Sequence, residues 1–233
     1  MIKRAVILAG GLGTRLKPFT DAIPKPLLPI GEKAVLEIQI ERLVRFGFEE
    51  VYIATNYKSN YIENFLGDGQ RYGVKIFFSK EETPLGTAGP LKLLEDKLDA
   101  PFLVLNGDIL TLTDFGDMFD YAVKRDSVFI AGIKEIVMPY AFGNIFLDGE
   151  RVVKIEEKPN IVTYALAGIN LLKPEIFRWI PAGQYYGMDA LLQALIRSGE
   201  PIIKYDIGEY WLDIGRMDDY EKAQADCERF DKE

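Results

Sequence analysis

The chain has 233 residues, of which 48% are hydrophobic and 27% charged, a composition typical of globular proteins rather than disordered or membrane-embedded ones. Its formal charge of −8 disfavours binding to a nucleic-acid backbone or an anionic membrane surface. No stretch approaches the roughly 20 apolar residues of a membrane span, and the run 5–9 is too short for a signal peptide. We therefore expect one globular domain over residues 1–233, with neither nucleic acid nor membrane as partner.

The chain contains no histidine and a single cysteine, Cys227. One cysteine excludes an internal disulfide and a cysteine-based zinc site, which favours a cytoplasmic location. The absence of histidine excludes Ser-His-Asp and Cys-His nucleophiles as well as histidine-ligated metals. Carboxylates, lysines, arginines, backbone amides and an oxygen-ligated metal such as Mg²⁺ are left to supply the chemistry.

In chain order, short apolar runs alternate with amphipathic segments, which predicts βαβ units and a mainly parallel sheet. The predicted strands cover residues 5–8, 51–54, 74–78, 102–105, 128–131, 152–155 and 165–172. The predicted helices cover residues 36–47, 61–66, 175–180, 189–197 and 218–230, with a further helix starting near Gly86. Because no linker or repeat separates the two halves, we expect their strands to share one sheet.

The first predicted strand ends at Ala9 and leads into Gly10-Gly11-Leu12-Gly13-Thr14-Arg15. Glycines at these positions let backbone amides approach a polyphosphate, although a simple tight turn would use them equally well. The segment matches neither the Walker A pattern nor G-x-G-x-x-G. Prolines on both sides of Lys25 restrict the backbone there and would present this lysine in a fixed position, whereas the alternative is a solvated surface lysine.

Two aspartates stand out further along the chain. Asp108 follows the buried strand 102–105, at the edge where open α/β sheets bind ligands. Asp213 lies in Tyr210-Trp211-Leu212-Asp213-Ile214-Gly215. Taken singly, the first could be a turn residue and the second a turn cap.

The run 8–16 together with Pro24-Lys25-Pro26 resembles the N-terminal motif of the sugar nucleotidyltransferases, the nucleotide-diphosphate-sugar pyrophosphorylases. Similar motifs continue through nearly the whole chain. The resemblance implies a Rossmann-like three-layer α/β fold with a mixed, mainly parallel central sheet, residues 1–110 binding the nucleotide and 111–233 the sugar phosphate. It also implies that Arg15 clamps the triphosphate, that Lys25 neutralises charge at the α-phosphate, and that Asp108 and Asp213 bind Mg²⁺.

The same resemblance assigns residues to each substrate. Glu157-Lys158-Pro159 is similar to the family's Glu-Lys-Pro motif, so Lys158 would bind the sugar phosphate and Glu157 a sugar hydroxyl; a solvated charge cluster is the alternative. Gly143, Gly168 and Asn170 would line the sugar, but many relatives have tyrosine where this chain has Asn170, which leaves the sugar open. The expected nucleotide contacts are Leu8, Ala9, Gly10, Gly11, Gly13, Thr14, Glu81, Pro84, Gly86, Thr87 and Asn106.

The segment 79–91 resembles the corresponding stretch of mannose-1-phosphate guanylyltransferases, and relatives that use uridine or thymidine nucleotides carry glutamine at the position of Glu81. A carboxylate only accepts hydrogen bonds, which suits the adjacent N1–H and N2–H donors of guanine, although cytosine also has a donor amino group. Glu81 could instead be an exposed loop acid. We expect GTP as donor and mannose 1-phosphate as acceptor, with heptose or glucosamine 1-phosphate as alternatives.

The implied reaction is in-line attack of the sugar phosphate on the α-phosphorus of the triphosphate, which releases pyrophosphate and requires neither a protein nucleophile nor a general base. The product would be a nucleotide sugar of the kind used to build surface polysaccharides. The rival interpretations are a cytidylyl-, uridylyl- or thymidylyltransferase, and a catalytically silent regulatory subunit that binds nucleotide sugar. The sequence leaves a homodimer open.

Overall fold

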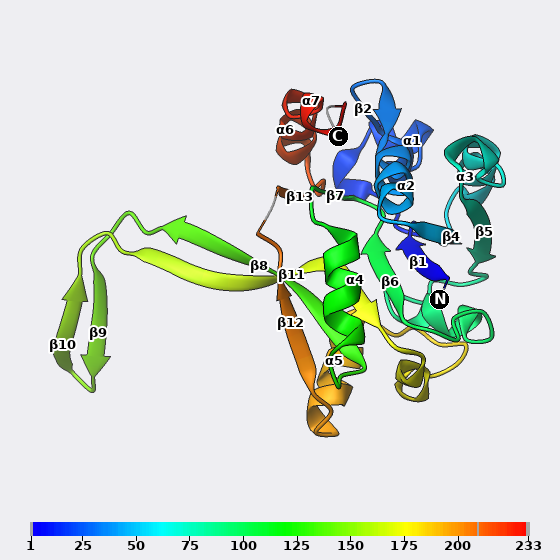
Figure 1. Cartoon of the computed structure of the whole chain (residues 1–233). Coiled ribbons are helices and arrows are strands. Elements are labelled where there is room, and N and C mark those ends of the chain that lie inside the picture. The colour runs from blue at the N-terminus through cyan, green and yellow to red at the C-terminus, as the bar shows by residue number, and fades with distance from the viewer. Residues whose placement is uncertain (1, 209, 232–233) are drawn as a thin grey trace.

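The computed structural model describes residues 2–208 and 210–231, and its centre is a seven-stranded sheet in the order β12-β8-β11-β6-β1-β4-β5 (Figure 1). The parallel strands on one side of the sheet are β1 (Lys3–Leu8), β4 (Phe48–Thr55), β5 (Lys75–Lys80) and β6 (Phe102–Asn106). On the other side, β8 (Phe129–Pro139) and β12 (Ile202–Asp206) are parallel to each other, and β11 (Asn160–Leu172) runs antiparallel to both β6 and β8. The predicted mixed, mainly parallel sheet is confirmed, with strands of both halves in it.

The central strands are buried on both faces, since Ala5, Val6 and Ile7 are all 0% exposed. This explains why they read as continuous apolar runs rather than alternating ones. One face packs against α2 (Val35–Arg45), α3 (Ser59–Leu66) and α4 (Phe115–Val123). The other face packs against the 3-10 helices η4 (Gly89–Leu94) and η5 (Pro174–Trp179) and against α5 (Met188–Arg197). The result is the expected three-layer arrangement.

A third, smaller core joins the two ends of the chain. It lies between the segment after β1 and the last helices, and its members include Leu16, Leu28, Leu212 and Ile214. The elements around it are η1 (Thr14–Leu16), α1 (Phe19–Ala22), η2 (Lys25–Leu27), the pair β2 (Pro29–Ile30) and β3 (Lys33–Ala34), the pair β7 (Ile109–Thr111) and β13 (Trp211–Asp213), α6 (Met217–Ala225) and α7 (Glu228–Asp231). This core fixes the loops that follow β1 and β6 relative to β13.

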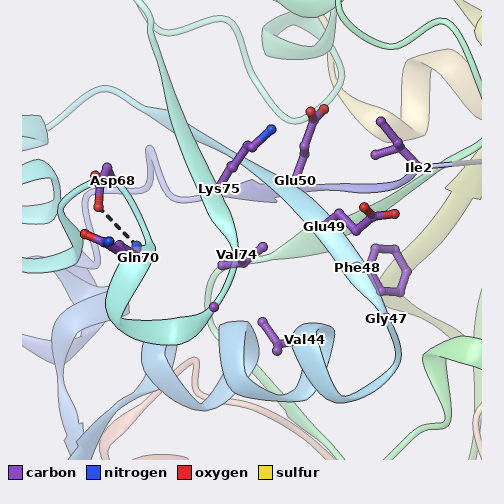
Figure 2. A pocket seen from close by; sticks show the side chains of 11 residues that line it. Ile2, Val44, Gly47, Phe48, Glu49, Glu50, Asp68, Gln70, Val74 and Lys75 are labelled. Atoms are coloured by element: carbon purple, nitrogen blue, oxygen red, sulfur yellow. Dashed lines mark hydrogen bonds between the residues drawn. The ribbon is translucent and has the colours of Figure 1, made fainter.

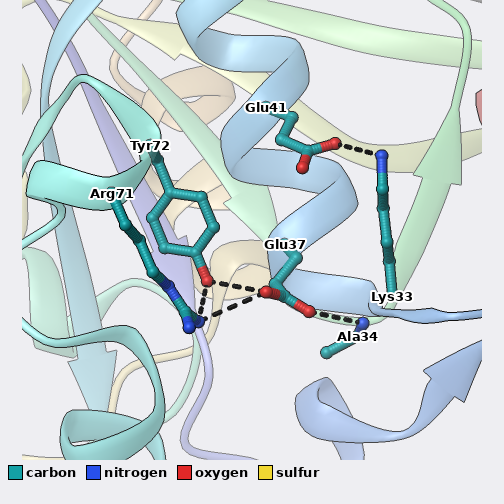
Figure 3. Close-up of polar contacts among 6 residues, drawn as sticks. All are labelled: Lys33, Ala34, Glu37, Glu41, Arg71 and Tyr72. Carbon is teal, nitrogen blue, oxygen red and sulfur yellow. Dashed lines mark hydrogen bonds and ion pairs between the residues drawn. The ribbon is translucent and has the colours of Figure 1, made fainter.

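The N-terminus of α2 is held by Glu37, one of whose carboxylate oxygens accepts the Ala34 N–H at 3.0 Å (Figure 3). The other oxygen accepts from the Tyr72 hydroxyl at 2.9 Å and from the Arg71 guanidinium at 3.2 Å, both on η3 (Gln70–Tyr72). Burial raises the pKa of Tyr72 to about 12. This network ties the crossover after α3 to the start of α2, and Lys33 and Glu41 add an ion pair beside it.

One part of the chain leaves the body. Strands β8 and β11 stay paired from Ile133 and Leu166 out to Pro139 and Asn160, and beyond them β9 (Asn144–Asp148) and β10 (Arg151–Glu156) form an antiparallel hairpin. In Figure 1 this ribbon projects to the left of the molecule. We call residues 134–166 the arm.

The predicted strands are all present, but two helical predictions differ from the structure. The helix expected to start near Gly86 is wrong in its onset: Gly86 has φ +83°, outside the helical region, and a 3-10 helix begins only at Gly89. The segment 218–230 is divided into α6 and α7. Helix α4 and strands β9 and β12 were not predicted. None of the helices in the described part of the chain combines the length and the apolar composition of a membrane span.

Candidate active site

A cavity of about 580 Å³ opens at the carboxyl ends of β1, β4 and β6, where open α/β sheets bind ligands. Thirteen of the twenty predicted site residues line it: Leu8, Gly10, Gly11, Gly13, Thr14, Arg15, Lys25, Glu81, Pro84, Gly86, Thr87, Asn106 and Asp108. Ala9 is 2% exposed and lies behind the cavity wall. The structure therefore gathers predicted residues from four separate segments of the sequence around one space.

The glycine-rich loop packs directly on the segment that carries Lys25. Gly13 has φ +62°, and a Cβ atom there would lie 2.8 Å from Cγ2 of Thr20 and 3.1 Å from Cβ of Lys25. The Thr20 hydroxyl also donates to the Gly13 carbonyl at 2.9 Å. Glycine is required at this position both for the backbone conformation and for the close approach. The loop and the proline-flanked lysine thus form one unit at the cavity wall.

Four charged side chains converge beside this unit. Lys25 is 9% exposed, and its Nζ lies 2.5 Å from Oδ2 of Asp108 in the turn between β6 and β7. Strand β13 pairs with β7 so that Asp213 stands opposite Ile109. The residue after Asp213, Ile214, donates its N–H to the Asp108 carbonyl at 3.0 Å. The guanidinium of Arg15 is close to the same turn, because a Cβ on Gly215 would lie 3.5 Å from its Nη2. Two carboxylates and two cations, from four segments, therefore meet.

The electrostatics of Asp213 reflect this crowding. Burial raises the pKa of its carboxyl, and the nearby Asp108 carboxylate raises it further, while Lys25 and Arg15 oppose both effects. A dication placed between the two carboxylates would relieve that repulsion. Mg²⁺ is commonly held by one or two protein carboxylates, with substrate phosphates and water completing the shell, so the donor set fits this ion.

Glu81 also lines the cavity and is 7% exposed, so the alternative of an exposed loop acid is wrong. Its Oε2 accepts the Leu85 N–H at 2.7 Å, and its Oε1 would lie 2.9 Å from a Cβ on Gly10. Burial raises the pKa of this carboxyl, and the Leu85 N–H and the Asn56 side chain oppose that rise. The hydrogen bond to Leu85 holds the carboxylate against the first glycine of the glycine-rich loop.

The loop after Glu81 is fixed by the chain segment before α5. The N–H groups of Ala88 and Gly89 both donate to the Tyr186 carbonyl at 3.0 Å. The Thr87 hydroxyl accepts the Met188 N–H at 2.8 Å. The wall formed by Pro84, Gly86 and Thr87 is thus attached to the second half of the chain.

Two of the predicted sugar-binding residues lie on β11, close to the cavity. Gly168 has φ +67°, and a Cβ there would lie 2.6 Å from Nδ2 of Asn106, so glycine is needed for this contact. Asn170 is 4% exposed, pairs in register with Val104 and Ala131, and its Oδ1 has no hydrogen-bond partner. Neither Gly168 nor Asn170 is among the residues that line the cavity.

The remaining predicted sugar-binding residues come together on the arm. A Cβ on Gly143 would lie 3.4 Å from Oε2 of Glu157, and Lys158 follows in the turn between β10 and β11. Lys158 has φ +45°, which is uncommon for a residue with a side chain and unfavourable before a proline. The structure therefore unites Gly143, Glu157 and Lys158 with each other but not with the cavity.

Five residues of the cavity wall were not predicted: Leu12, Asn56, Pro90, Tyr185 and Gly215. Asn56 directly follows β4, so the rule that ligands bind at the carboxyl ends of parallel strands would have found it. Gly215 closes the motif that contains Asp213. Tyr185 comes from a distant loop, and no local pattern identifies it.

A second hollow of about 660 Å³ lies at the opposite edge of the sheet (Figure 2). Val44, Phe48 and Val74 form its apolar part, and Glu50 and Lys75 stand on the strands beside it. No predicted site residue lines it, and three of its four charged lining residues are the acids Glu49, Glu50 and Asp68. The charged cavity at the carboxyl edge is therefore the candidate active site.

The sheet order and the glycine-rich loop at its carboxyl edge are typical of α/β proteins that bind nucleotides. The chain belongs to the nucleotidyl transferase family, whose model matches residues 4–229. A crystal structure of HddC from Yersinia pseudotuberculosis has a TM-score of 0.76 and 29% identity, over 98% of this chain and 100% of that one. The same protein has also been solved in complex with GMP-PN, at 28% identity and the same TM-score of 0.76 over 98% of this chain and 100% of that one.

Curated relatives point to two different donors. A UTP–glucose-1-phosphate uridylyltransferase of Synechocystis is 34% identical over 94% of this chain, and the mannose-1-phosphate guanylyltransferase catalytic subunit beta of Danio rerio is 32% identical over 93%. In each case the match covers 62% of the relative, so this chain spans less than two thirds of their length. Relatives of nearly equal identity are therefore named for a uridylyl and for a guanylyl donor.

Proposed function

We propose that this chain joins a nucleoside triphosphate, GTP by preference, to a sugar 1-phosphate, mannose 1-phosphate by preference, with release of pyrophosphate. The observation that supports this most strongly is the meeting of Arg15, Lys25, Asp108 and Asp213 beside the glycine-rich loop. Family membership and the relatives that act on sugar 1-phosphates support the same reaction class.

The protein's contribution would be positioning and charge neutralisation. The sugar phosphate is ionised at neutral pH and attacks the α-phosphorus directly, so the bond to the β-phosphate breaks without a protein nucleophile. The loop amides from Gly10 to Thr14 would hold the phosphates, and Arg15 would take up charge on the leaving pyrophosphate. Lys25 is already anchored by Asp108, which would present its ammonium group to the α-phosphate without further ordering.

Asp108 and Asp213 would hold Mg²⁺, which supplies charge neutralisation between the phosphate groups. Lys25 contacts one oxygen of Asp108, and the other oxygen remains for a metal. Among the described residues, no group of three or more candidate ligands forms a complete metal cage. This fits an ion that takes its remaining ligands from substrate and water.

The preference for GTP depends on Glu81. Its carboxylate lines the cavity and is held in place by the Leu85 N–H, so it would offer acceptors to the adjacent N1–H and N2–H donors of guanine. A uracil edge would place carbonyl oxygens against the same carboxylate. The structure of HddC in complex with GMP-PN supports the proposal that the donor of this chain is a guanine nucleotide.

The direct test is a matrix of GTP, CTP, UTP and dTTP against mannose, glucose, glucosamine and heptose 1-phosphates, read by pyrophosphate release in Mg²⁺. We expect GTP with mannose 1-phosphate to give the highest kcat/KM, with heptose and glucosamine 1-phosphates next. If GTP were the poorest donor, the assignment of Glu81 would be wrong. If no pair released pyrophosphate, the chain would be a silent nucleotide-sugar-binding subunit.

A further inference from the structure

The arm carries an unusual amount of bare apolar surface. More than half of the exposed large apolar side chains of the described chain lie on it: Val137, Met138, Tyr140, Phe142, Ile145, Phe146, Leu147, Val152, Val153, Ile155, Ile161, Val162, Tyr164 and Leu166. If each leaves on the order of 100 Å² uncovered, the arm exposes over about 1,000 Å², whereas the largest patch on a typical monomer is about 300–600 Å². The same area exceeds the roughly 800 Å² that each partner contributes to a standard interface.

The hairpin at the end of the arm has one clean apolar face. Ile145 pairs with Ile155 and Leu147 with Val152, so these four side chains share a face, and each is more than half exposed. The opposite face carries the Lys154–Glu156 ion pair, with the Lys154 ammonium over the Phe146 ring. A two-stranded hairpin is at best marginally stable in water by itself. The charged face can remain in contact with water, whereas the apolar face would be stabilised by packing against another surface.

The ribbon between the body and the hairpin is apolar on both faces. Val137 and Val162 form a cross-strand pair on one face, and Met138 and Ile161 form a pair on the other. If the arm folded back over its own cavity, only one of these faces would be covered. The strand ladder is unbroken from Ile133 to Pro139, which spans about 20 Å at 3.3 Å per residue. A stiff, two-sided apolar ribbon is suited to insertion against another molecule.

The arm also carries a functional motif away from its own cavity. Gly143, Glu157 and Lys158 gather at the base of the hairpin, and no arm residue lines the cavity within the described chain. The backbone at Lys158 is held in a left-handed conformation, and strain of this kind is typical of functional sites. Arg15 and Lys25, the cations proposed to bind the triphosphate, line the cavity, whereas Lys158, the cation proposed to bind the sugar phosphate, does not.

We propose that two copies of this chain form a two-fold symmetric dimer in which each arm lies across the partner, so that Glu157 and Lys158 of one copy complete the sugar-phosphate side of the other copy's cavity. A two-fold axis makes the exchange reciprocal, so both arms are covered and both cavities completed by the same contact. The role of Lys158 in this proposal rests on the proposed function, whereas the docking surface does not.

The docking surface is tested by the molar mass in solution, from light scattering after size-exclusion chromatography. We expect wild type to be a dimer and the double variant Ile145→Lys/Ile155→Lys to be a monomer that keeps its circular dichroism spectrum but loses sugar-dependent turnover. Ile196→Lys is the matched control, because Ile196 is an exposed isoleucine on α5, outside the arm, and it should stay dimeric and active. A monomeric wild type, or a double variant that remains dimeric, would overturn the proposal.

The exchange of sites is tested by complementation. Lys25→Ala and Lys158→Ala, each inactive as a homodimer, are co-expressed with different affinity tags and the heterodimer is isolated. If the arm acts on the partner, one of its two sites contains both substitutions and the other contains neither, so about half of wild-type turnover returns. No recovery, or a Lys158→Ala homodimer with normal KM for the sugar phosphate, would overturn the exchange. If wild type released no pyrophosphate but remained a dimer that the arm variant dissociates, the proposed function would fail and the docking surface would stand.

Discussion

The ammonium group of Lys25 lies 2.5 Å from Oδ2 of Asp108, although the two residues are 83 positions apart in the chain. Lys25 is almost fully buried between the glycine-rich loop and this carboxylate. The pair explains how a lysine flanked by prolines becomes a fixed charge at the cavity wall, and it places that charge next to the proposed metal ligands.

We expect Lys25→Ala and Asp108→Asn each to lower kcat by roughly a hundredfold or more, corresponding to about 3 kcal/mol of lost transition-state stabilisation. Initial rates of pyrophosphate release measure this, and circular dichroism checks the fold. Lys17→Ala serves as control, because Lys17 is exposed and forms its ion pair with the exposed Asp21. Near-normal turnover of either active-site variant would remove these residues from the mechanism.

Replacing Glu81 with glutamine should change the choice of base. The amide both donates and accepts, so we expect kcat/KM for GTP to fall at least about tenfold and that for UTP to rise. Glu82→Gln makes the same change in charge at the neighbouring exposed residue and should leave the ratio of the two donors unchanged. Parallel titrations of GTP and UTP at fixed sugar phosphate give the ratio, and an unchanged ratio in Glu81→Gln would contradict the assignment.

Glu81→Gln should also change how the thermal stability of the ligand-free protein depends on pH. Burial raises the pKa of Glu81 in the folded state, so the folded chain binds its proton more tightly than the unfolded chain does. This group's contribution to stability therefore falls as the pH rises from the ordinary carboxyl value through the raised one. The Tm of Glu81→Gln relative to wild type should be higher at pH 7 than at pH 4. A difference that shrinks as the pH rises would contradict this.

Gly168→Ala should disturb the cavity through Asn106. The added Cβ would lie 2.6 Å from Nδ2 of Asn106 and would also strain a backbone with φ +67°, at a cost of about 1–3 kcal/mol. Gly199→Ala is the matched control, because Gly199, after α5, has φ +74° but no atom within 4 Å of the added Cβ. Both variants should lower Tm, and only Gly168→Ala should lower kcat/KM, by about tenfold. Equal kinetic effects would show that the contact with Asn106 has no part in the site.

Much of the fold could be predicted from the sequence, because the central strands are buried on both faces and appear as uninterrupted apolar runs. The position of Asp108 at the cavity, just after one of those strands, followed from the same logic. Asp213 and Glu81 required the resemblance to a family, since an isolated carboxylate has several possible roles. Helix α4 and strand β12 went unpredicted.

The arm could not be predicted from local patterns. Strands β9 and β10 place apolar side chains on one face of the hairpin, as many strands of a sheet do. Their sequence does not indicate that the ribbon leaves the body of the protein. Tertiary contacts alone decide whether Lys158 faces its own cavity or a partner's. The same holds for Tyr185, which reaches the cavity wall only because the loop before α5 is hydrogen-bonded to the segment 87–89.

The most direct test of the central claim uses GTP labelled with ³²P at either the α- or the γ-phosphate, with mannose 1-phosphate and Mg²⁺. We predict that the α-label appears in a nucleotide sugar, that the γ-label appears in pyrophosphate, and that both depend on the sugar phosphate and are lost in Lys25→Ala. Transfer of the γ-label to the sugar, or release of label at the same rate without sugar phosphate, would contradict nucleotidyl transfer by this site.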